Sequence, residues 1–234
     1  MSNVLEIRDI HTFIGQFHIL EGVSLEVADG SITVLLGRNG AGKTTTLKSI
    51  MGLTPPSRGK ILLNNEEIQG QRSHHIAGRG IGYVPENRVI FRDLTVEENL
   101  KIAERKKGDL SRRAEFIYSL FPDLKRLIKL PGGHLSGGQQ QMLAIARALV
   151  ADNKLLLIDE PSEGLAPVII EQVMEAVRKL SADTTILLVE QNFIMASQLA
   201  DRYVIIESGQ SVQNGAMSDL VKDDATIRRY LGAA

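Results

Sequence analysis

The sequence predicts an α/β fold in which a single core domain carries an inserted helical lobe. Three observations support this prediction: residues 1–85 are rich in period-2 alternation, residues 93–152 change to helical spacing, and the last third alternates strands with helices. A strand–helix–strand rhythm favours a largely parallel sheet with helices on its faces. A chain of 234 residues can bury one substantial core together with a smaller lobe.

The N-terminal part is expected to form strands. Residues 4–8 and 23–27 alternate as half-buried strands do, whereas residues 31–36 form a more continuous apolar run that leads into glycines. Such a run is typical of a strand covered on both faces. Residues 60–63 and 81–84 continue the strand pattern.

The middle of the chain has helical signals. Thr95 and Glu98 have the spacing of a capping box, which predicts a helix start at this point. A second helical run is expected to stop at Pro122, because proline interrupts a helix. A Pro-Gly-Gly linker at residues 131–133 then precedes a strong amphipathic helix that carries Met142.

The last third is expected to alternate strands and helices. Residues 154–158, 185–189 and 203–206 are apolar runs of strand length. Residues 170–177 between the first two runs have the spacing of an amphipathic helix.

The composition excludes several classes of protein. The formal net charge is −1 and aromatic residues make up 4% of the chain, so neither a basic surface nor stacking platforms for nucleic acid are expected. The chain has no cysteine, which excludes disulfides, thiolate metal sites and a thiol nucleophile. No secretory signal is expected, and the apolar runs are too short to cross a bilayer. If the protein acts at a membrane, it must do so through a partner.

A glycine-rich segment lies between a predicted strand and a predicted helix. Residues 37–44, Gly-Arg-Asn-Gly-Ala-Gly-Lys-Thr, match the phosphate-binding loop pattern without departure. Such a loop presents converging backbone N–H groups to triphosphate oxygens, and the helix N-terminus adds partial positive charge. Lys43 would then reach the β- and γ-phosphates, and the Thr44 hydroxyl would coordinate Mg²⁺. The alternative is a glycine-rich turn without a ligand.

Two acids, Asp159 and Glu160, directly follow the apolar run of residues 155–158. The carboxyl end of a parallel strand is where such sheets bind ligands. Asp159 is expected to be a direct or indirect partner of Mg²⁺, and Glu160 could orient an attacking water and accept its proton. Alone, such a pair often marks only a turn; the phosphate-binding loop upstream favours the functional interpretation.

Residues 135–141, Leu-Ser-Gly-Gly-Gln-Gln-Gln, open the helix that follows the linker. Ser136 and Gln139 have capping-box spacing, which offers a purely structural interpretation. Gly137 and Gly138 do not help a helix, however, because each costs about 1 kcal/mol relative to alanine. Bare backbone at a helix N-terminus suits close approach to an anion, so the segment predicts a second phosphate-binding surface.

These motifs and their order resemble the ATP-binding cassette (ABC) family over essentially the whole chain. The resemblance implies a P-loop NTPase core with a mostly parallel sheet, an antiparallel β subdomain and an inserted α-helical subdomain. It implies one ABC domain over residues 1–234, with its core at 1–90 and 153–234 and its helical subdomain at about 91–152. The implied activity is ATP hydrolysis coupled to transport across a membrane.

The resemblance also implies partners. In the family two subunits pack head to tail, so that the phosphate-binding loop of one faces the Leu-Ser-Gly-Gly-Gln segment of the other. Residues 162–165 would communicate across this dimer. The expected partners are a second copy or another ABC ATPase, membrane-embedded permease subunits and, indirectly, a substrate-binding protein, but no nucleic acid. The expected location is cytoplasmic, at the inner face of the cell membrane through the permease.

The motifs and the resemblance together give three sets of candidate residues, with ATP and Mg²⁺ as cofactors. The expected catalytic residues are Lys43, Glu160 and Gln191. The expected Mg²⁺-binding residues are Thr44, Asp159 and Glu86. The expected nucleotide-binding residues, of which the last three would contact the γ-phosphate held by the partner, are Gly37, Asn39, Gly40, Ala41, Gly42, Lys43, Thr44, Thr45, Ser136, Gly137 and Gly138.

Three positions depart from the general pattern of the family. Glu86 replaces a Gln that senses Mg²⁺ and the membrane partner, and an ionised carboxylate cannot donate a hydrogen bond. Gln191 replaces a His that contacts the γ-phosphate, and it cannot titrate near neutral pH. The aromatic residue that stacks on adenine aligns with Ile14, so the platform could be Ile14, Phe13 or Phe17. The alternative is that both phenylalanines belong to the core.

Short peptides narrow the resemblance to a subgroup. Residues 84–88, 97–100, 163–167 and 188–192 resemble the ATPases of branched-chain amino-acid importers and of urea importers. The predicted function is therefore ATP hydrolysis for an importer of branched-chain or other hydrophobic amino acids. The alternatives are the ATPase of a urea or amide importer, a non-transport ABC ATPase acting on DNA or ribosomes, and a regulatory module that binds ATP without hydrolysing it.

Overall fold

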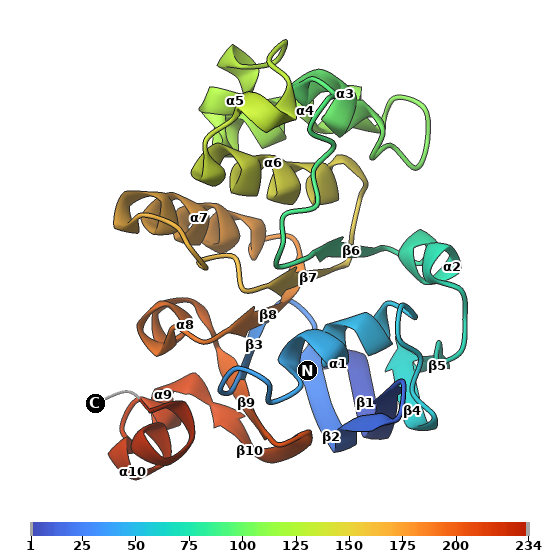
Figure 1. The fold of residues 1–234 in the computed structure, drawn as a ribbon, viewed down its shortest axis with the longest axis vertical. Coiled ribbons are helices and arrows are strands. Elements are labelled where there is room, and N and C mark those ends of the chain that lie inside the picture. Colours follow the sequence, from blue (N-terminus) through green and yellow to red (C-terminus); the bar gives the residue numbers. More distant parts are fainter. Residues whose placement is uncertain (1, 233–234) are drawn as a thin grey trace.

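The computed structural model describes residues 2–232, which form two β-sheets surrounded by helices (Figure 1). The strands are β1 (Asn3–Ile14), β2 (Phe17–Ala28), β3 (Ile32–Leu36), β4 (Arg58–Leu63), β5 (Glu66–Glu67), β6 (Ile81–Val84), β7 (Leu155–Asp159), β8 (Thr185–Glu190), β9 (Arg202–Glu207) and β10 (Gln210–Ala216). The helices are α1 (Lys43–Ile50), α2 (Ser73–Gly78), α3 (Val96–Lys101), α4 (Asp109–Leu120), α5 (Pro122–Arg126), η1 (Gly132–His134), α6 (Gly137–Val150), α7 (Pro167–Leu180), α8 (Phe193–Leu199), α9 (Met217–Leu220), α10 (Asp224–Thr226) and η2 (Ile227–Leu231).

The larger sheet has the strand order β10-β9-β3-β8-β7-β6. Its strands pair in parallel from β9 to β6, and β10 is antiparallel to β9 at the edge. The three strands β3, β7 and β8 are buried along their whole length, as strands covered on both faces are. The predicted mostly parallel sheet is confirmed.

Two hydrophobic clusters lie on opposite faces of this sheet. Alternate residues of β3 divide between them, because successive side chains of a strand point to opposite faces. Val34 and Leu36 pack with residues of α6 and α7, whereas Leu35 packs with residues of α1 and the smaller sheet. The continuous apolar runs of the central strands therefore serve two cores at once.

The smaller sheet is antiparallel, with the order β2-β1-β4-β5. It lies beside α1 in the lower part of the molecule (Figure 1). The strands predicted at residues 4–8 and 23–27 are confirmed, but they extend further and meet in a hairpin. The antiparallel β subdomain is confirmed as well.

Helices α3 to α6 form the upper part of the molecule and fall within residues 91–152 (Figure 1). Capping boxes form at Thr95–Glu98 and at Ser136–Gln139, as the spacing predicts. The second helical run stops before Pro122, as predicted: α4 ends at Leu120, and Pro122 opens the separate helix α5. Proline is tolerated in the first turn, where its missing N–H would be free in any case.

Among the helices within residues 2–232, none combines the length and the apolar composition needed to cross a membrane.

Candidate functional site

The phosphate-binding loop connects β3 to α1 and has a tightly closed shape. Gly42 has φ 110°, and a Cβ at this position would lie 2.7 Å from a side-chain carbon of Leu20, so the loop requires glycine here. Lys43 is only 4% exposed, and its Nζ donates to the carbonyl oxygens of Gly37 at 2.9 Å and Arg38 at 3.2 Å. The ammonium group therefore lies across the loop.

The start of α1 has no side-chain cap. Its first backbone N–H groups consequently remain available to an anion, and the helix dipole favours negative charge there. The other predicted nucleotide-binding residues lie in the same turn: Asn39 and Gly40 are exposed, Ala41 is buried, and Thr45 is half-buried in the first turn of α1.

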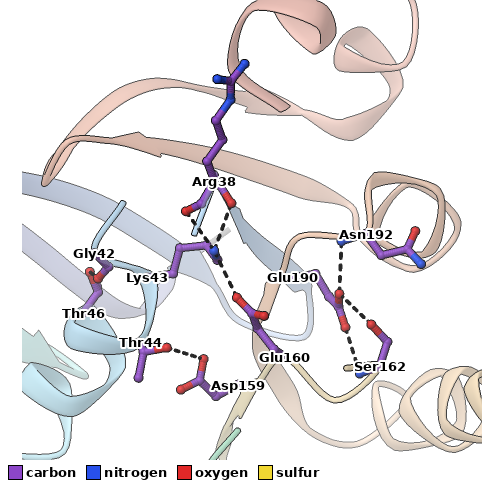
Figure 2. A network of polar contacts seen from close by, with 11 residues as sticks. Arg38, Gly42, Lys43, Thr44, Thr46, Asp159, Glu160, Ser162, Glu190 and Asn192 are labelled. Atoms are coloured by element: carbon purple, nitrogen blue, oxygen red, sulfur yellow. Dashed lines mark hydrogen bonds and ion pairs between the residues drawn. The ribbon is translucent and has the colours of Figure 1, made fainter. Parts of the chain in front are cut away.

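The acidic pair at the end of β7 meets this loop (Figure 2). The Thr44 hydroxyl donates to Oδ1 of Asp159 at 3.1 Å, and Nζ of Lys43 lies 3.0 Å from Oε1 of Glu160. Glu160 has φ 43°, a left-handed conformation that is unfavourable for a residue other than glycine. Its backbone N–H donates to the carbonyl oxygen of Val189 at 2.9 Å. The pair and the loop are thus brought together as the sequence predicts.

Burial and neighbouring negative charges raise the pKa of two carboxylates near Thr44. The pKa of Asp159 is raised to about 6, first by burial and then by the negative charges of Glu86 and Glu160. The pKa of Glu86 is also raised, by burial and by Glu163 and Glu160. A cation would relieve this repulsion, and hydroxyl and carboxylate oxygens are the ligands that Mg²⁺ prefers.

Within residues 2–232, no three His, Cys, Asp or Glu side chains are close enough to hold a metal ion by themselves. The Thr44 hydroxyl and Asp159 could share such an ion with substrate oxygens, because Mg²⁺ is commonly bound through one or two carboxylates and phosphates. The donor set therefore fits Mg²⁺ bound together with a triphosphate.

Two neighbouring residues at the end of β8 have contrasting surroundings. Gln191, predicted to be catalytic, is exposed just beyond the strand. Glu190 is 1% exposed, and burial raises its pKa to about 7. The sequence analysis missed Glu190, although it ends the apolar run of residues 186–189 just as Asp159 ends the run of residues 155–158. An acid that terminates a buried strand was the available signal.

The start of α6 is capped by its own side chains and packed against neighbouring residues. Ser136 Oγ accepts from the Gln139 N–H at 3.3 Å, and Gln139 Oε1 accepts from the Ser136 N–H at 3.0 Å. A Cβ at Gly138 would lie 2.8 Å from the Ile169 side chain, so packing against α7 explains this glycine. At Gly137 a Cβ would lie 3.0 Å from Nη1 of Arg88.

Within residues 2–232, the two segments predicted to bind phosphate lie in different parts of the molecule. Among residues 2–232, no hydrogen bond or ion pair joins residues 135–139 to residues 37–45. Figure 1 shows α6 in the upper, helical part and α1 in the lower part beside the antiparallel sheet.

The three candidates for the adenine platform lie at the tip of the β1–β2 hairpin. The interpretation that both phenylalanines belong to the core is wrong, because Phe13 is 46% and Phe17 65% exposed. Ile14 is 48% exposed and pairs with Phe17 across the hairpin. One face of the Phe13 ring stacks on His18, with ring centroids 4.2 Å apart. All three side chains remain candidates.

Comparison with known proteins agrees with this geometry. A family model described as ABC transporter matches residues 20–163. The high-affinity branched-chain amino acid transport ATP-binding protein BraG of Pseudomonas aeruginosa is 41% identical over 98% of this chain and 100% of its own. The probable branched-chain amino acid transport ATP-binding protein LivF of Archaeoglobus fulgidus is 39% identical over 93% and 94%. The lipopolysaccharide export system ATP-binding protein LptB of Escherichia coli is 34% identical over 92% and 91%.

The fold is also that of solved ATP-binding cassettes. The crystal structure of a nucleotide-free ATP-binding cassette from an ABC transporter superposes with a TM-score of 0.86 at 25% identity, over 100% of both chains. The family model covers more than half of the chain, and the relatives span nearly all of it. The chain therefore belongs to the ABC transporter family, in which it is a subunit that binds and hydrolyses ATP.

Proposed function

We propose that this ATPase powers an importer of branched-chain or other hydrophobic amino acids. The assignment of the transported substrate rests on the similarity to BraG and LivF, which are 41% and 39% identical over nearly the full chain. LptB is less similar, at 34%, and its name refers to export of lipopolysaccharide. The substitutions Glu86 and Gln191 lie in the peptides that resemble importers of amino acids and urea.

We assign the hydrolytic roles from the contacts around Lys43. Its ammonium group would stabilise negative charge that develops on the β- and γ-phosphates. Glu160 is held 3.0 Å from this ammonium group, where its carboxylate can orient a water for in-line attack and accept the proton. The exposed Gln191 can donate a hydrogen bond to the γ-phosphate.

Nucleotide and metal would occupy adjoining positions. Gly37, Asn39, Gly40, Ala41, Gly42, Lys43, Thr44 and Thr45 form the loop and helix start that would hold the phosphates of ATP. Thr44, Asp159 and Glu86 would hold Mg²⁺, which shields the phosphate charge when it is bound. The raised pKa values of Asp159 and Glu86 support this proposal, because both carboxylates would be stabilised by a cation.

The site becomes complete in a dimer, either of two copies or with another ABC ATPase. Ser136, Gly137 and Gly138 would contact the γ-phosphate held by the other subunit. The positions of the two segments within one chain support this arrangement, because α1 lies in the lower part of the molecule and α6 in the upper, helical part (Figure 1).

The proposed membrane partner is a permease, which would bring the protein to the inner face of the cell membrane. A cavity of about 550 Å³ extends from Thr44 and Asp159 past Glu86 and Arg88 to residues of α6. A permease segment seated at its mouth would lie next to Glu86 and could thus sense the metal site.

Replacing Glu160 by glutamine tests the hydrolytic assignment. Glutamine keeps the size of the side chain but cannot accept the proton of water. We expect phosphate release to fall by roughly 10²- to 10³-fold, while the affinity for ATP remains within a few-fold. Glu171→Gln, on the exposed face of α7, is the matched control. Hydrolysis at the wild-type rate by Glu160→Gln would refute the role of Glu160.

Uptake measurements test the cargo. Cells that lack the gene should lose uptake of labelled leucine, isoleucine and valine, and the wild-type chain but not Glu160→Gln should restore it. Urea uptake and lipopolysaccharide export are measured in the same cells. If leucine uptake is unchanged while one of the other two processes is lost, the amino-acid assignment is wrong although the ATPase assignment stands.

A further inference from the structure

Glu190, the last residue of β8, is a buried carboxylate that the proposed hydrolytic roles leave unused. It is 1% exposed, and no positively charged side chain pairs with it among residues 2–232. A buried carboxylate destabilises a fold unless hydrogen-bond donors meet it. The four residues before it, Ile186–Val189, are buried and apolar, so packing of the strand does not explain a carboxylate at its end.

Three donors converge on this carboxylate from two different loops (Figure 2). The Ser162 hydroxyl donates to Oε2 at 3.0 Å, and the Ser162 backbone N–H donates to Oε1 at 3.3 Å. The Asn192 backbone N–H donates to Oε2 at 3.3 Å. One side chain therefore fixes the segment that follows β7 and the segment that follows β8.

On the β7 side, these contacts hold the backbone around Glu160 at two points. Val189 accepts from the Glu160 N–H at 2.9 Å, and Glu190 accepts from Ser162 two residues later. Between these points Glu160 has its left-handed conformation, which a non-glycine residue adopts only when its surroundings impose it. With both points fixed, the carboxylate of Glu160 stays beside the Lys43 ammonium group.

On the β8 side, the same carboxylate closes a turn around Gln191. Its bond to the Asn192 N–H spans Gln191, and the Asn192 side chain accepts from the Met195 N–H at 3.1 Å as the cap of α8. Gln191 is thereby held between the strand end and the first turn of the helix.

We propose that Glu190 is a positioning residue for ATP hydrolysis, which holds Ser162 and Asn192 with one carboxylate and so fixes the places of Glu160 and Gln191. This inference rests on the catalytic role proposed for Glu160. It predicts that a change at Glu190 slows the chemical step while ATP binding at the phosphate loop is preserved.

The variant Glu190→Gln tests this inference in the full chain, assayed in the same assembly in which the wild type hydrolyses ATP. Glutamine keeps the size of the side chain but turns an N–H₂ group towards the N–H and O–H donors. We expect kcat to fall roughly 10- to 100-fold, because small misplacements of reacting groups have effects of this size. KM and the Kd for ATP should change less than about threefold, because Lys43 and its loop are untouched.

Ser162→Ala provides an independent variant, since it removes one donor and leaves the buried carboxylate in place. Its kcat should fall less than that of Glu190→Gln. The kcat of the double variant should be no lower than that of Glu190→Gln alone, because both changes act through one contact. If Glu190→Gln does not fold, a lower kcat at unchanged KM in Ser162→Ala supports the inference, and a wild-type kcat overturns it.

The matched control is Asp201→Asn, which removes a carboxylate at the opposite end of the same sheet. Asp201 Oδ2 accepts from the Ile32 N–H at 2.8 Å, at the start of β3. This variant should lower Tm without changing kcat per folded molecule. The inference is overturned if Glu190→Gln has the wild-type kcat, or if its loss matches only the loss of folded protein.

Glu160→Gln separates the two possible failures. If Glu160→Gln is inactive but Glu190→Gln is fully active, only the inference about Glu190 fails. If Glu160→Gln hydrolyses ATP at the wild-type rate, the role of Glu160 fails and the inference fails with it.

Discussion

The starts of α1 and α6 are two glycine-rich helix N-termini that treat their free N–H groups in opposite ways. The start of α1, after Gly42, has no side-chain cap, and a buried lysine and several carboxylates surround it. The start of α6 has a complete capping box made by the neutral side chains of Ser136 and Gln139. The first helix start leaves its N–H donors without a side-chain acceptor, whereas the second satisfies two N–H donors through its own side chains.

We interpret this difference as one between two kinds of anion site. At α1 a single chain supplies the donors, whereas at α6 the bound nucleotide would come from another subunit. At α1 an anion finds N–H groups without a side-chain cap, and the Lys43 ammonium group beside them would exchange its contacts within the chain for phosphate oxygens. At α6 an anion has to compete with the internal cap. We therefore expect α1 to determine whether ATP binds, and α6 to respond to ATP that another subunit presents.

The largest effect is expected from removing the charge at α1. Lys43→Ala should lower kcat/KM by roughly 10³-fold or more, because it removes the ammonium group that would stabilise charge on the β- and γ-phosphates. Phosphate release and the Kd for ATP are the measurements. Lys60→Ala, an exposed lysine on β4, is the control. If Lys43→Ala retains a tenth of the wild-type activity, α1 does not determine binding as proposed.

The end of β8 should make stability depend on pH, in contrast to the neutral cap of α6. The pKa of Glu190 is raised by burial from 4.5 to about 7, so between these values the folded chain binds more protons than the unfolded chain. The free energy of unfolding should therefore fall as pH rises through this window, by on the order of 3 kcal/mol from this residue, and change no further above it.

Urea unfolding at pH 5 and pH 8 measures this contribution. Glu190→Gln should remove it, so that the difference between the two pH values shrinks relative to the wild type. Gln139→Ala, which breaks the neutral cap of α6, should destabilise the chain equally at both pH values. An unchanged pH difference in Glu190→Gln would show that the carboxylate is not buried as described.

A smaller effect on hydrolysis should distinguish the two capping boxes, at Thr95–Glu98 and at Ser136–Gln139. Ser136→Ala and Thr95→Ala each remove a cap and should each lower the free energy of unfolding by about 1 kcal/mol. Only Ser136→Ala should also slow hydrolysis, by roughly 10- to 100-fold, because its hydroxyl would contact the partner's γ-phosphate. Equal activities of the two variants would leave the α6 start with a structural role alone.

The smallest effect concerns Gln191. Because its amide does not titrate, the activity of the wild type should show no ionisation from this position. Gln191→His should introduce one near pH 6.5, visible as a new inflection in the pH profile while the activity at pH 8 changes only a few-fold. A Gln191→His profile that superposes on the wild-type profile would contradict the assignment.

The motifs of the candidate site could be read from the sequence because each is a contiguous segment with its own chemistry. The phosphate loop, the acidic pair and the capped start of α6 are local patterns, and the structure has each at the predicted place. The role of Glu190 was not readable in this way. It depends on Ser162 and Asn192, which lie in two separate loops, and only the fold brings them to one carboxylate.

The parts of the fold that were missed are those with weak or ambiguous patterns. β10 is a polar edge strand, and α9 and α10 span four and three residues, so hydrophobic periodicity has little to act on. Phe13 and Phe17 were ambiguous for another reason. An aromatic residue is usually buried, and only the turn of the β1–β2 hairpin places these two on the surface.

The left-handed backbone conformation of Glu160 lowers the stability of the fold at a residue that is proposed to be needed for ATP hydrolysis. Glycine would adopt this conformation without strain, yet it would remove the acid on which hydrolysis is proposed to depend. Selection for stability alone would therefore favour loss of the acid at this position, whereas selection for ATP hydrolysis would retain it. Engineering a more robust form of this protein should accordingly begin at sites remote from the carboxyl ends of β7 and β8.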